Sequence, residues 1–298
     1  MSVASAYASD VSPPEQRAKS FGKIGAAFGL GFIFGPMLGG VLGSVNLQLP
    51  FYVAAALSAA NFIYGALFVP ESLAQTQRSA FSWEKIKPAF NPFATLWRLM
   101  QRKELRGLLY VFILSSFAQM MLQTTWVLYT HFRFHWTSLE NGIALFFVGV
   151  SAAVVQAGML SWLIKKMGEM RLALWGLASG AITFVCYGLA TEGWMMYVFI
   201  LCNLLSFAAG PALQSIASKA TDPREQGALM GSLQSINSLG SILMPLLGTQ
   251  ILGMVSHLPA NDMRLGACYF LCAVMQGLAW WLAVRFFRQR PVGGLEKP

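Results

Sequence analysis

Residues 21–43 read FGKIGAAFGLGFIFGPMLGGVLG, a run that is apolar almost throughout and punctuated by glycine and proline. As a helix it is long enough to cross the roughly 30 Å of hydrocarbon in a bilayer. Comparable apolar runs follow near 50–69, 106–130, 139–164, 170–190, 194–217, 227–254 and 266–287. The sequence therefore predicts an all-α integral membrane protein with eight spans, preceded by a nine-residue apolar stub at 1–9.

Composition supports the same class. Hydrophobic residues make up 56% of the chain and charged residues 11%, whereas a soluble domain carries about 25% charged residues. The formal net charge is +9, which in a soluble protein would indicate nucleic-acid binding. If the stub ends in the cytoplasm, however, only Arg133 and Arg264 of the 21 Lys and Arg residues fall in outer loops. The charge thus predicts topology: a multi-pass protein of the inner (plasma) membrane with both termini cytoplasmic, a bilayer partner and no nucleic acid.

The chain shows no pattern of enzymatic or metal chemistry. Its four cysteines all lie inside apolar runs, at spacings that match no zinc signature. No nucleotide-binding loop, nucleophile elbow or HExxH pattern is present. We expect no catalytic residues, no metal and no cofactor.

A shift of 209 residues aligns the start of the chain with a later segment. It places Gly22 on Gly231, Gly31 on Gly240, Pro36 on Pro245 and Gly39 on Gly248 without a gap. Both copies follow a short cytoplasmic loop, so they have the same orientation, as in transporters built from parallel repeats. We therefore expect the end of a first six-helix half at 1–69, an inter-half loop at 70–104, a second half at 105–288 and a tail at 289–298.

The repeat also predicts how much of the architecture the chain holds. The spans from 106 to 217 should have counterparts upstream of residue 8, beginning about a hundred residues before Met1. On this interpretation the stub is the end of span 4, and the eight runs are spans 5 to 12 of a partial twelve-helix, two-half bundle.

Residues 6–40, AYASDVSPPEQRAKSFGKIGAAFGLGFIFGPMLGG, resemble the drug–proton antiporters of the major facilitator superfamily, specifically the tetracycline efflux transporters. The likeness rests on a spaced glycine signature, and the segments 132–136 (FRFHW) and 211–214 (PALQ) are also similar to that family. The signature comprises Gly22, Gly31, Gly35, Pro36, Gly39 and Gly40.

The resemblance implies the major facilitator fold and proton-coupled efflux of tetracycline or a similar amphipathic drug by alternating access. It also implies that the signature helix packs against a helix of the other half and seals the pathway. The alternative is ordinary tight packing, because glycines let neighbouring helices approach closely. The repeat-related helix carries Gly231, Gly240, Pro245 and Gly248 in equivalent positions.

A basic loop at 165–171 lies where the family has a cytoplasmic loop motif. Its motif residues are Lys165, Lys166, Gly168 and Arg171. The strict superfamily form has Asp where Lys165 stands, which puts a gating role in doubt. A simple anchor under the positive-inside rule is the alternative.

Polar side chains inside spans must face the bundle interior or water. They are candidates for a drug cavity, with interhelical hydrogen bonding as the alternative. The candidates are Asn61, Gln119, Gln123, Trp126, Gln156, Asn203, Gln214, Gln234 and Asn237.

No Asp or Glu falls in the interior of a predicted span, since Glu140 stands at the very start of the run 139–164, so no proton-coupling carboxylate is named. The partners we expect are a small-molecule drug and protons, acting on a monomer. The alternative is a truncated membrane fragment that does not transport.

Overall fold

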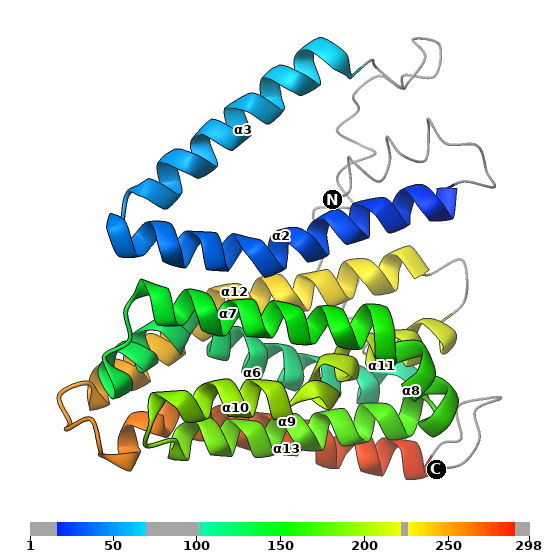
Figure 1. Cartoon of the computed structure of the whole chain (residues 1–298). Coiled ribbons are helices and arrows are strands. Elements are labelled where there is room, and N and C mark those ends of the chain that lie inside the picture. Colours follow the sequence, from blue (N-terminus) through cyan, green and yellow to red (C-terminus); the bar gives the residue numbers. More distant parts are fainter. Residues whose placement is uncertain (1–16, 70–100, 102, 222–225, 290–298) are drawn as a thin grey trace. The chain divides into compact units, whose positions relative to one another are not determined.

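The computed structural model describes residues 17–69, 101, 103–221 and 226–289, and within these ranges all regular structure is helical. Figure 1 shows the order of the elements. They are α2 (Arg17–Val45), α3 (Leu49–Phe68), α6 (Lys103–Phe134), α7 (Ser138–Ala153), a π-helical segment (Val154–Met159), α8 (Leu160–Met167), α9 (Glu169–Leu189), α10 (Gly193–Cys202), α11 (Leu204–Lys219), α12 (Gln226–Val255), a 3-10 turn (Met263–Gly266) and α13 (Ala267–Gln289).

Each predicted apolar run is helical over most of its length, which confirms the all-α prediction. Among the described residues, six helices are long and apolar enough to cross a membrane: Leu49–Phe68, Leu105–Phe134, Ser138–Gln156, Glu169–Leu189, Leu229–Val255 and Met263–Arg288. α10 and α11 make a seventh if they count as one span. The apolar part of α2, Gly29–Val45, is shorter.

Two spans depart from the regular helices that the sequence predicted. α10 and α11 meet at an angle of 46°, where Asn203 leaves the helical conformation (φ −89°, ψ 28°) and accepts a hydrogen bond from the Ser179 hydroxyl at 2.9 Å. In the other span, α7 passes into α8 through a π-helical turn that contains Gln156 and Gly158. Such turns are frequent at functional sites.

The chain divides into two compact units. The first comprises 1–86 with 137–149, and the second comprises 87–136 with 150–298. The sequence-based boundaries at 69, 105 and 288 remain a prediction.

In the first unit α2 and α3 form a helical hairpin. The Asn46 side chain accepts a hydrogen bond from the Gln48 backbone at 2.8 Å, and Pro50 stands in the first turn of α3, where its missing N–H costs nothing. α3 buries none of its residues. Its surface is apolar all round, as suits a helix facing lipid or other helices.

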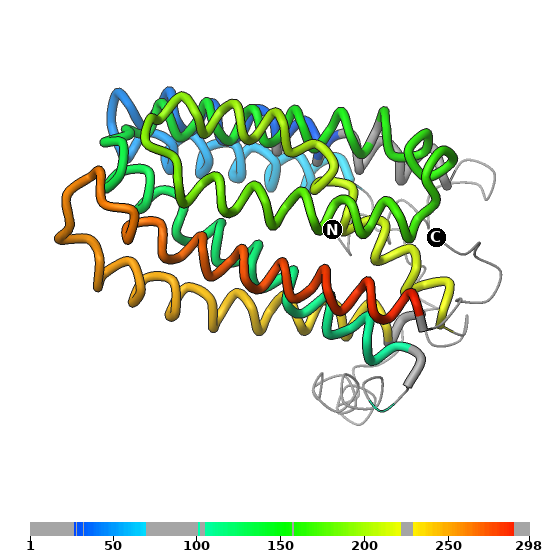
Figure 2. Tube along the Cα trace, turned by 90° about the horizontal axis from the view of Figure 1, so that it is seen from below, coloured from blue at the N-terminus to red at the C-terminus, as the bar shows by residue number. Residues whose placement is uncertain are grey.

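In the second unit α6 packs against α12 and α13, while α9 packs against α11 and α13. Figure 2 shows these helices running alongside one another. Since lipid is as apolar as a leucine side chain, such contacts depend on close packing. Gly176 of α9 provides it: a Cβ there would lie 2.7 Å from the Leu205 carbonyl oxygen and 2.8 Å from the Ala209 Cβ.

Candidate functional site

The signature helix α2 meets α7 backbone to backbone. A Cβ on Gly40 would lie 2.7 Å from the Gly142 Cα and 2.7 Å from the Ser138 carbonyl oxygen. A Cβ on Gly142 would lie 2.8 Å from the Gly40 Cα and 3.0 Å from the Pro36 carbonyl oxygen. No side chain fits at either position without moving the helices apart.

The contact continues in both directions along the two helices. Toward the start of α2, the ring centroids of Phe34 and Phe146 lie 6.4 Å apart. Toward its end, a Cβ on Gly43 would lie 3.3 Å from the Ser138 Cβ. The partner number falls as the α2 number rises, so the helices are antiparallel along this stretch. We call the contact from Phe34 to Gly43 with Ser138 to Phe146 the glycine seam.

Three of the other signature glycines do not contact α7. A Cβ on Gly31, Gly35 or Gly39 would have no heavy atom within 4 Å, while Gly22 lies in a stretch where only the helical backbone is described. Of the signature residues, the structure thus brings Pro36 and Gly40 into the seam.

The repeat-related glycines contact a different helix. In α12, a Cβ on Gly248 would lie 2.6 Å from the Thr125 Cγ2 and one on Gly240 would lie 3.2 Å from a ring carbon of Phe117, both on α6. Gly231 faces open space, and Pro245 lies inside the helix. In this copy of the repeat, two of the repeated glycines, Gly240 and Gly248, therefore allow α12 to pack closely against α6.

The candidate cavity residues divide into two groups. Exposed amides occur on α6, the π-helical turn, α11, α12 and α3: Gln119, Gln123, Gln156, Gln214, Gln234 and Asn61. Gln119 and Gln123 share one face of α6. The Gln214 amide approaches the Met230 Sδ of α12 at 3.2 Å, one turn before Gln234. The Gln214 amide of α11 thus lies against α12.

The remaining candidates lie elsewhere. Trp126 is 6% exposed and packs edge-on against Trp136 and Tyr187, at centroid distances of 6.3 and 5.6 Å, so the structure does not bring it to the surface that carries Gln119 and Gln123. Asn203 serves the bend between α10 and α11, and Asn237 is half-buried.

The basic loop connects α8 to α9 through Gly168, whose φ of 76° explains the glycine. Lys165, Lys166 and Arg171 are exposed, and the Lys166 Nζ lies 4.9 Å from the centre of the Trp162 ring. The loop thus carries its positive charges on the surface.

Glu169, the first residue of α9, is a group that sequence reasoning missed. Its side chain is 7% exposed. One carboxylate oxygen accepts hydrogen bonds from the Ser215 hydroxyl and the Lys219 ammonium, both at 2.8 Å. This pair fastens the start of α9 to the end of α11. The sequence assigned no role to Glu169, because its partners lie about fifty residues away in the chain.

Arg133 was also missed and counted only as an outer-loop charge. It is 4% exposed, and its Nε donates to the Ala190 carbonyl at 3.0 Å while another nitrogen donates to the Asp262 carbonyl. The Asp262 carboxylate itself pairs with Arg264 at 2.7 Å, and hydrogen bonds from Arg264 lower its pKa to about 2. Arg133 therefore ties the end of α6 to two other loops.

A polar cluster in the core of the second unit involves Gln276 of α13, which is 4% exposed. A Cβ on Gly180 of α9 would lie 2.9 Å from the Ser206 hydroxyl and 3.0 Å from the Gln276 amide nitrogen. Three helices thus meet around polar atoms. No group of three or more potential metal ligands occurs in the part of the chain that the structure describes.

Apolar spanning helices, glycine-mediated contacts and amides inside spans define a multi-pass membrane protein of the transporter kind. The profile of the Major Facilitator Superfamily matches residues 1–245, and the chain belongs to this family. Because it is a family of transporters, the prediction that the chain is not an enzyme is confirmed.

Two curated relatives are tetracycline resistance proteins. The class C protein of Escherichia coli is 32% identical over 249 residues, which cover 84% of this chain and 62% of the relative. The class D protein of Salmonella ordonez is 34% identical over 245 residues, covering 82% and 60%. The chain thus spans about 60% of the length of the relatives it matches.

Among solved structures, the human organic anion transporter MFSD10 matches with a TM-score of 0.62 at 24% identity. The match covers 94% of this chain and 66% of that one. This likeness confirms the predicted partial major facilitator fold.

Proposed function

We propose that this chain acts in secondary active transport and exports tetracycline or a similar amphipathic drug in exchange for protons by alternating access. The observation that carries the proposal is the glycine seam, where the helix with the antiporter signature touches α7 at Gly40 and Gly142. Because the two backbones touch directly, the contact leaves no gap for solvent. A transporter needs such a seal so that its pathway does not leak. The names of the tetracycline resistance relatives support the drug class.

The exposed amides support a drug surface. Gln119, Gln123 and Gln234 make no hydrogen bond to another described residue, and the hydrogen bond that the Gln214 amide makes is to the Met230 sulfur. Amides that served to join helices would be paired with polar partners. Unpaired amides amid apolar side chains suit an amphipathic polycyclic molecule.

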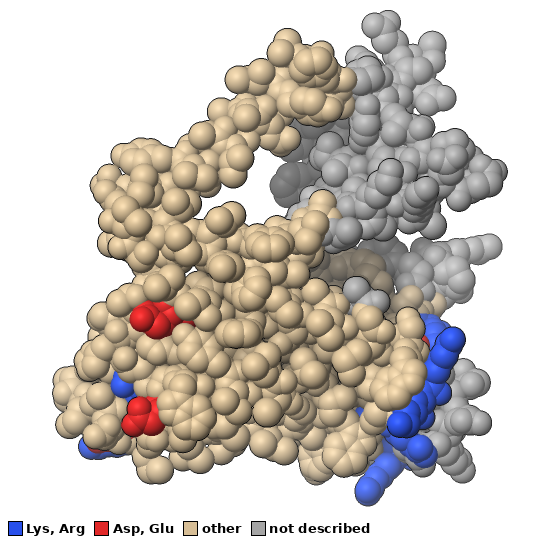
Figure 3. Space-filling model, viewed as in Figure 1, with Lys and Arg blue, Asp and Glu red and all other residues tan. Residues whose placement is uncertain are grey.

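The charge distribution supports the orientation. In the second unit, Lys165, Lys166, Arg171 and Lys219 lie at the same end as Arg285 and Arg288, and Figure 3 shows Lys and Arg gathered there with a long uncharged stretch beside them. By the positive-inside rule this end faces the cytoplasm. We propose a monomer in the plasma membrane with both termini on that side.

The test is uptake of radiolabelled tetracycline by everted membrane vesicles that contain the 298-residue chain. We expect uptake when the vesicle interior is acidified and its loss on adding a protonophore. Uptake that survives the protonophore would contradict proton coupling. Absence of uptake, with the chain verified in the membrane, would select the alternative of a non-transporting fragment.

A further inference from the structure

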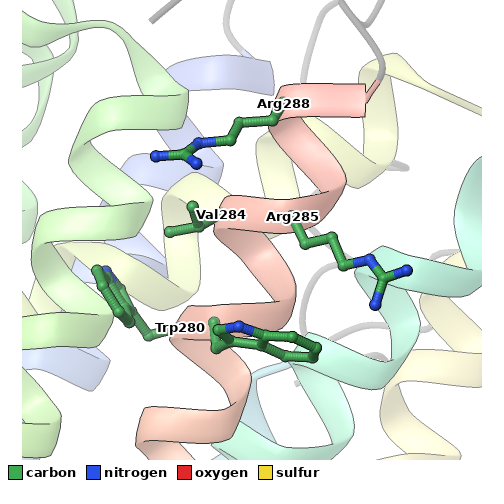
Figure 4. Close-up of a pocket in the computed structure, with 5 residues that line it drawn as sticks. Trp280, Val284, Arg285 and Arg288 are labelled. Carbon is green, nitrogen blue, oxygen red and sulfur yellow. The ribbon is translucent and has the colours of Figure 1, made fainter.

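A cleft of about 330 Å³ lies near the end of α13, at the basic end of the second unit. Figure 4 shows its lining, which comes from one nine-residue stretch of α13. The five lining residues are Trp280, Trp281, Val284, Arg285 and Arg288. At helical spacing, Trp280, Val284 and Arg288 form one row, while Trp281 and Arg285 form the next. The two tryptophans are 40% and 51% exposed.

The two arginines bring positive charge to this cleft without a carboxylate. The Arg285 guanidinium lies 5.6 Å from the centre of the Trp281 ring, and Figure 4 shows the Arg288 guanidinium on the other side of α13. Within the described ranges neither makes a salt bridge or a hydrogen bond to an acidic side chain. The edge of the cleft is therefore basic, whereas the lining itself is apolar.

The residues before the cleft supply an apolar path. Val274 and Leu278 stand seven and three residues before Trp281 and are 57% and 48% exposed, so an apolar stripe leads from the middle of the span to the tryptophans. Tryptophan prefers the membrane–water interface, and the arginines follow one turn later, toward the water. Apolar stripe, interfacial aromatics and cations thus occur in the order of an acyl chain, a glycerol backbone and a phosphate.

We propose that this cleft binds the headgroup of one anionic phospholipid. The phosphate is bound by the arginine side chains at the basic edge, and the first acyl carbons lie against Trp280, Trp281 and Val284. Basic sites on the cytoplasmic side of membrane helices are where anionic headgroups bind. The site is independent of drug transport, since none of its residues lies at the glycine seam or among the exposed amides.

The chain offers a matched control at the same end of the unit. Lys166 lies over Trp162 at 4.9 Å, with Lys165 beside it, so the variant K165Q/K166Q removes two charges next to an exposed tryptophan just as R285Q/R288Q does. A difference between these two variants isolates the cleft from the general attraction of a basic surface for anionic lipid.

The experiment is native mass spectrometry of the purified 298-residue chain in detergent, titrated with phosphatidylglycerol. We expect R285Q/R288Q to bind the first lipid about thirtyfold more weakly, the factor given by about 1 kcal/mol for each of two basic side chains. K165Q/K166Q should change it by less than about threefold. R285K/R288K should bind the first lipid with an affinity between those of the parent chain and R285Q/R288Q, because lysine keeps the charge without the planar fork.

Four outcomes would overturn the proposal. The first is an equal loss of phosphatidylglycerol affinity in R285Q/R288Q and K165Q/K166Q. The second is binding of phosphatidylcholine as tight as that of phosphatidylglycerol, and the third is displacement of the lipid by inorganic phosphate at equal concentration. The fourth is at least tenfold tighter phosphatidylglycerol binding by a chain that lacks residues 290–298, which would assign the cleft to the tail.

Discussion

Gly40 of α2 and Gly142 of α7 touch through their backbones, and a Cβ on either residue would lie within 3 Å of the other's Cα. Gly40 closes the antiporter signature, whereas Gly142 is not one of the signature residues. The contact gives a physical reason for the last signature glycine. It also makes the distance between α2 and α7 a quantity that single substitutions can change.

Cysteines at positions 43 and 138 should form a disulfide across the glycine seam. The Cβ positions of Gly43 and Ser138 lie 3.3 Å apart, close to the 3.5–4.5 Å typical of disulfides. The double variant is made in a chain whose cysteines at 186, 202, 268 and 272 are replaced by alanine, with a protease site in 70–104. After oxidation and cleavage we expect the two fragments to stay joined until a reductant is added.

The same cross-link should arrest drug uptake reversibly, because alternating access requires α2 and α7 to move relative to each other. The pair Gly35→Cys and Ser138→Cys is the control, since nothing lies within 4 Å of a Cβ at 35. Full uptake by the cross-linked chain would show that the seam stays fixed during transport.

Gly248→Ala should destabilise the packing of α12 on α6, whereas Gly253→Ala should not. The new methyl group would lie 2.6 Å from the Thr125 Cγ2, and Thr125 cannot rotate freely because its hydroxyl donates to the Met121 carbonyl at 2.7 Å. We expect a cost of about 1–3 kcal/mol, seen as a lower melting temperature in detergent. Gly253 lies on the same helix with open space around it, and an equal loss there would refute the steric explanation.

Arg133→Lys should lower the stability of the second unit by about 1–3 kcal/mol. Lysine cannot reach the carbonyls of Ala190 and Asp262 with the same fork, and buried acceptors that lose a donor carry a desolvation cost of this size. Arg264→Lys is the control, because its pair with Asp262 is exposed. The measurement is thermal unfolding of both variants, and indistinguishable melting temperatures would remove the role assigned to Arg133.

Lys219→Met should be more destabilising than Lys166→Met. Loss of Lys219 leaves the buried Glu169 carboxylate with one hydrogen bond, from Ser215. The Lys219 side chain is 53% exposed, so solvent reduces the effect to about 1 kcal/mol. Adding Glu169→Gln to Lys219→Met should recover part of the loss in thermal unfolding, and failure to do so would contradict a pairwise cause.

The helices could be predicted from hydropathy, because each apolar run is long and the charged residues of the loops on either side mark where it ends. The breaks could not. Asn203 bends a span through a hydrogen bond from Ser179 on another helix, and the turn at Gln156 has no breaker residue beyond Gly158. Both depend on tertiary contacts that composition does not encode.

The candidate site was predicted in the same uneven way. The sequence named Gln119, Gln123 and Trp126 as candidates together, but could not show that Trp126 turns away from the amides into the aromatic cluster with Tyr187. Glu169 was not among the candidates, although its carboxylate is buried and accepts hydrogen bonds from Ser215 and Lys219 of α11. Helical periodicity describes one helix, whereas burial depends on its neighbours.

We propose that the glycine seam works in proton-driven drug transport, and a comparison of two valine variants tests this role. Tetracycline uptake is measured in everted vesicles that carry Gly40→Val or Gly29→Val at equal abundance, since a Cβ at 29 has nothing within 4 Å. We predict that Gly40→Val loses uptake about tenfold, as overpacking against the α7 backbone separates the helices, and that Gly29→Val keeps more than about half. Equal uptake by both variants and the parent chain would contradict the claim.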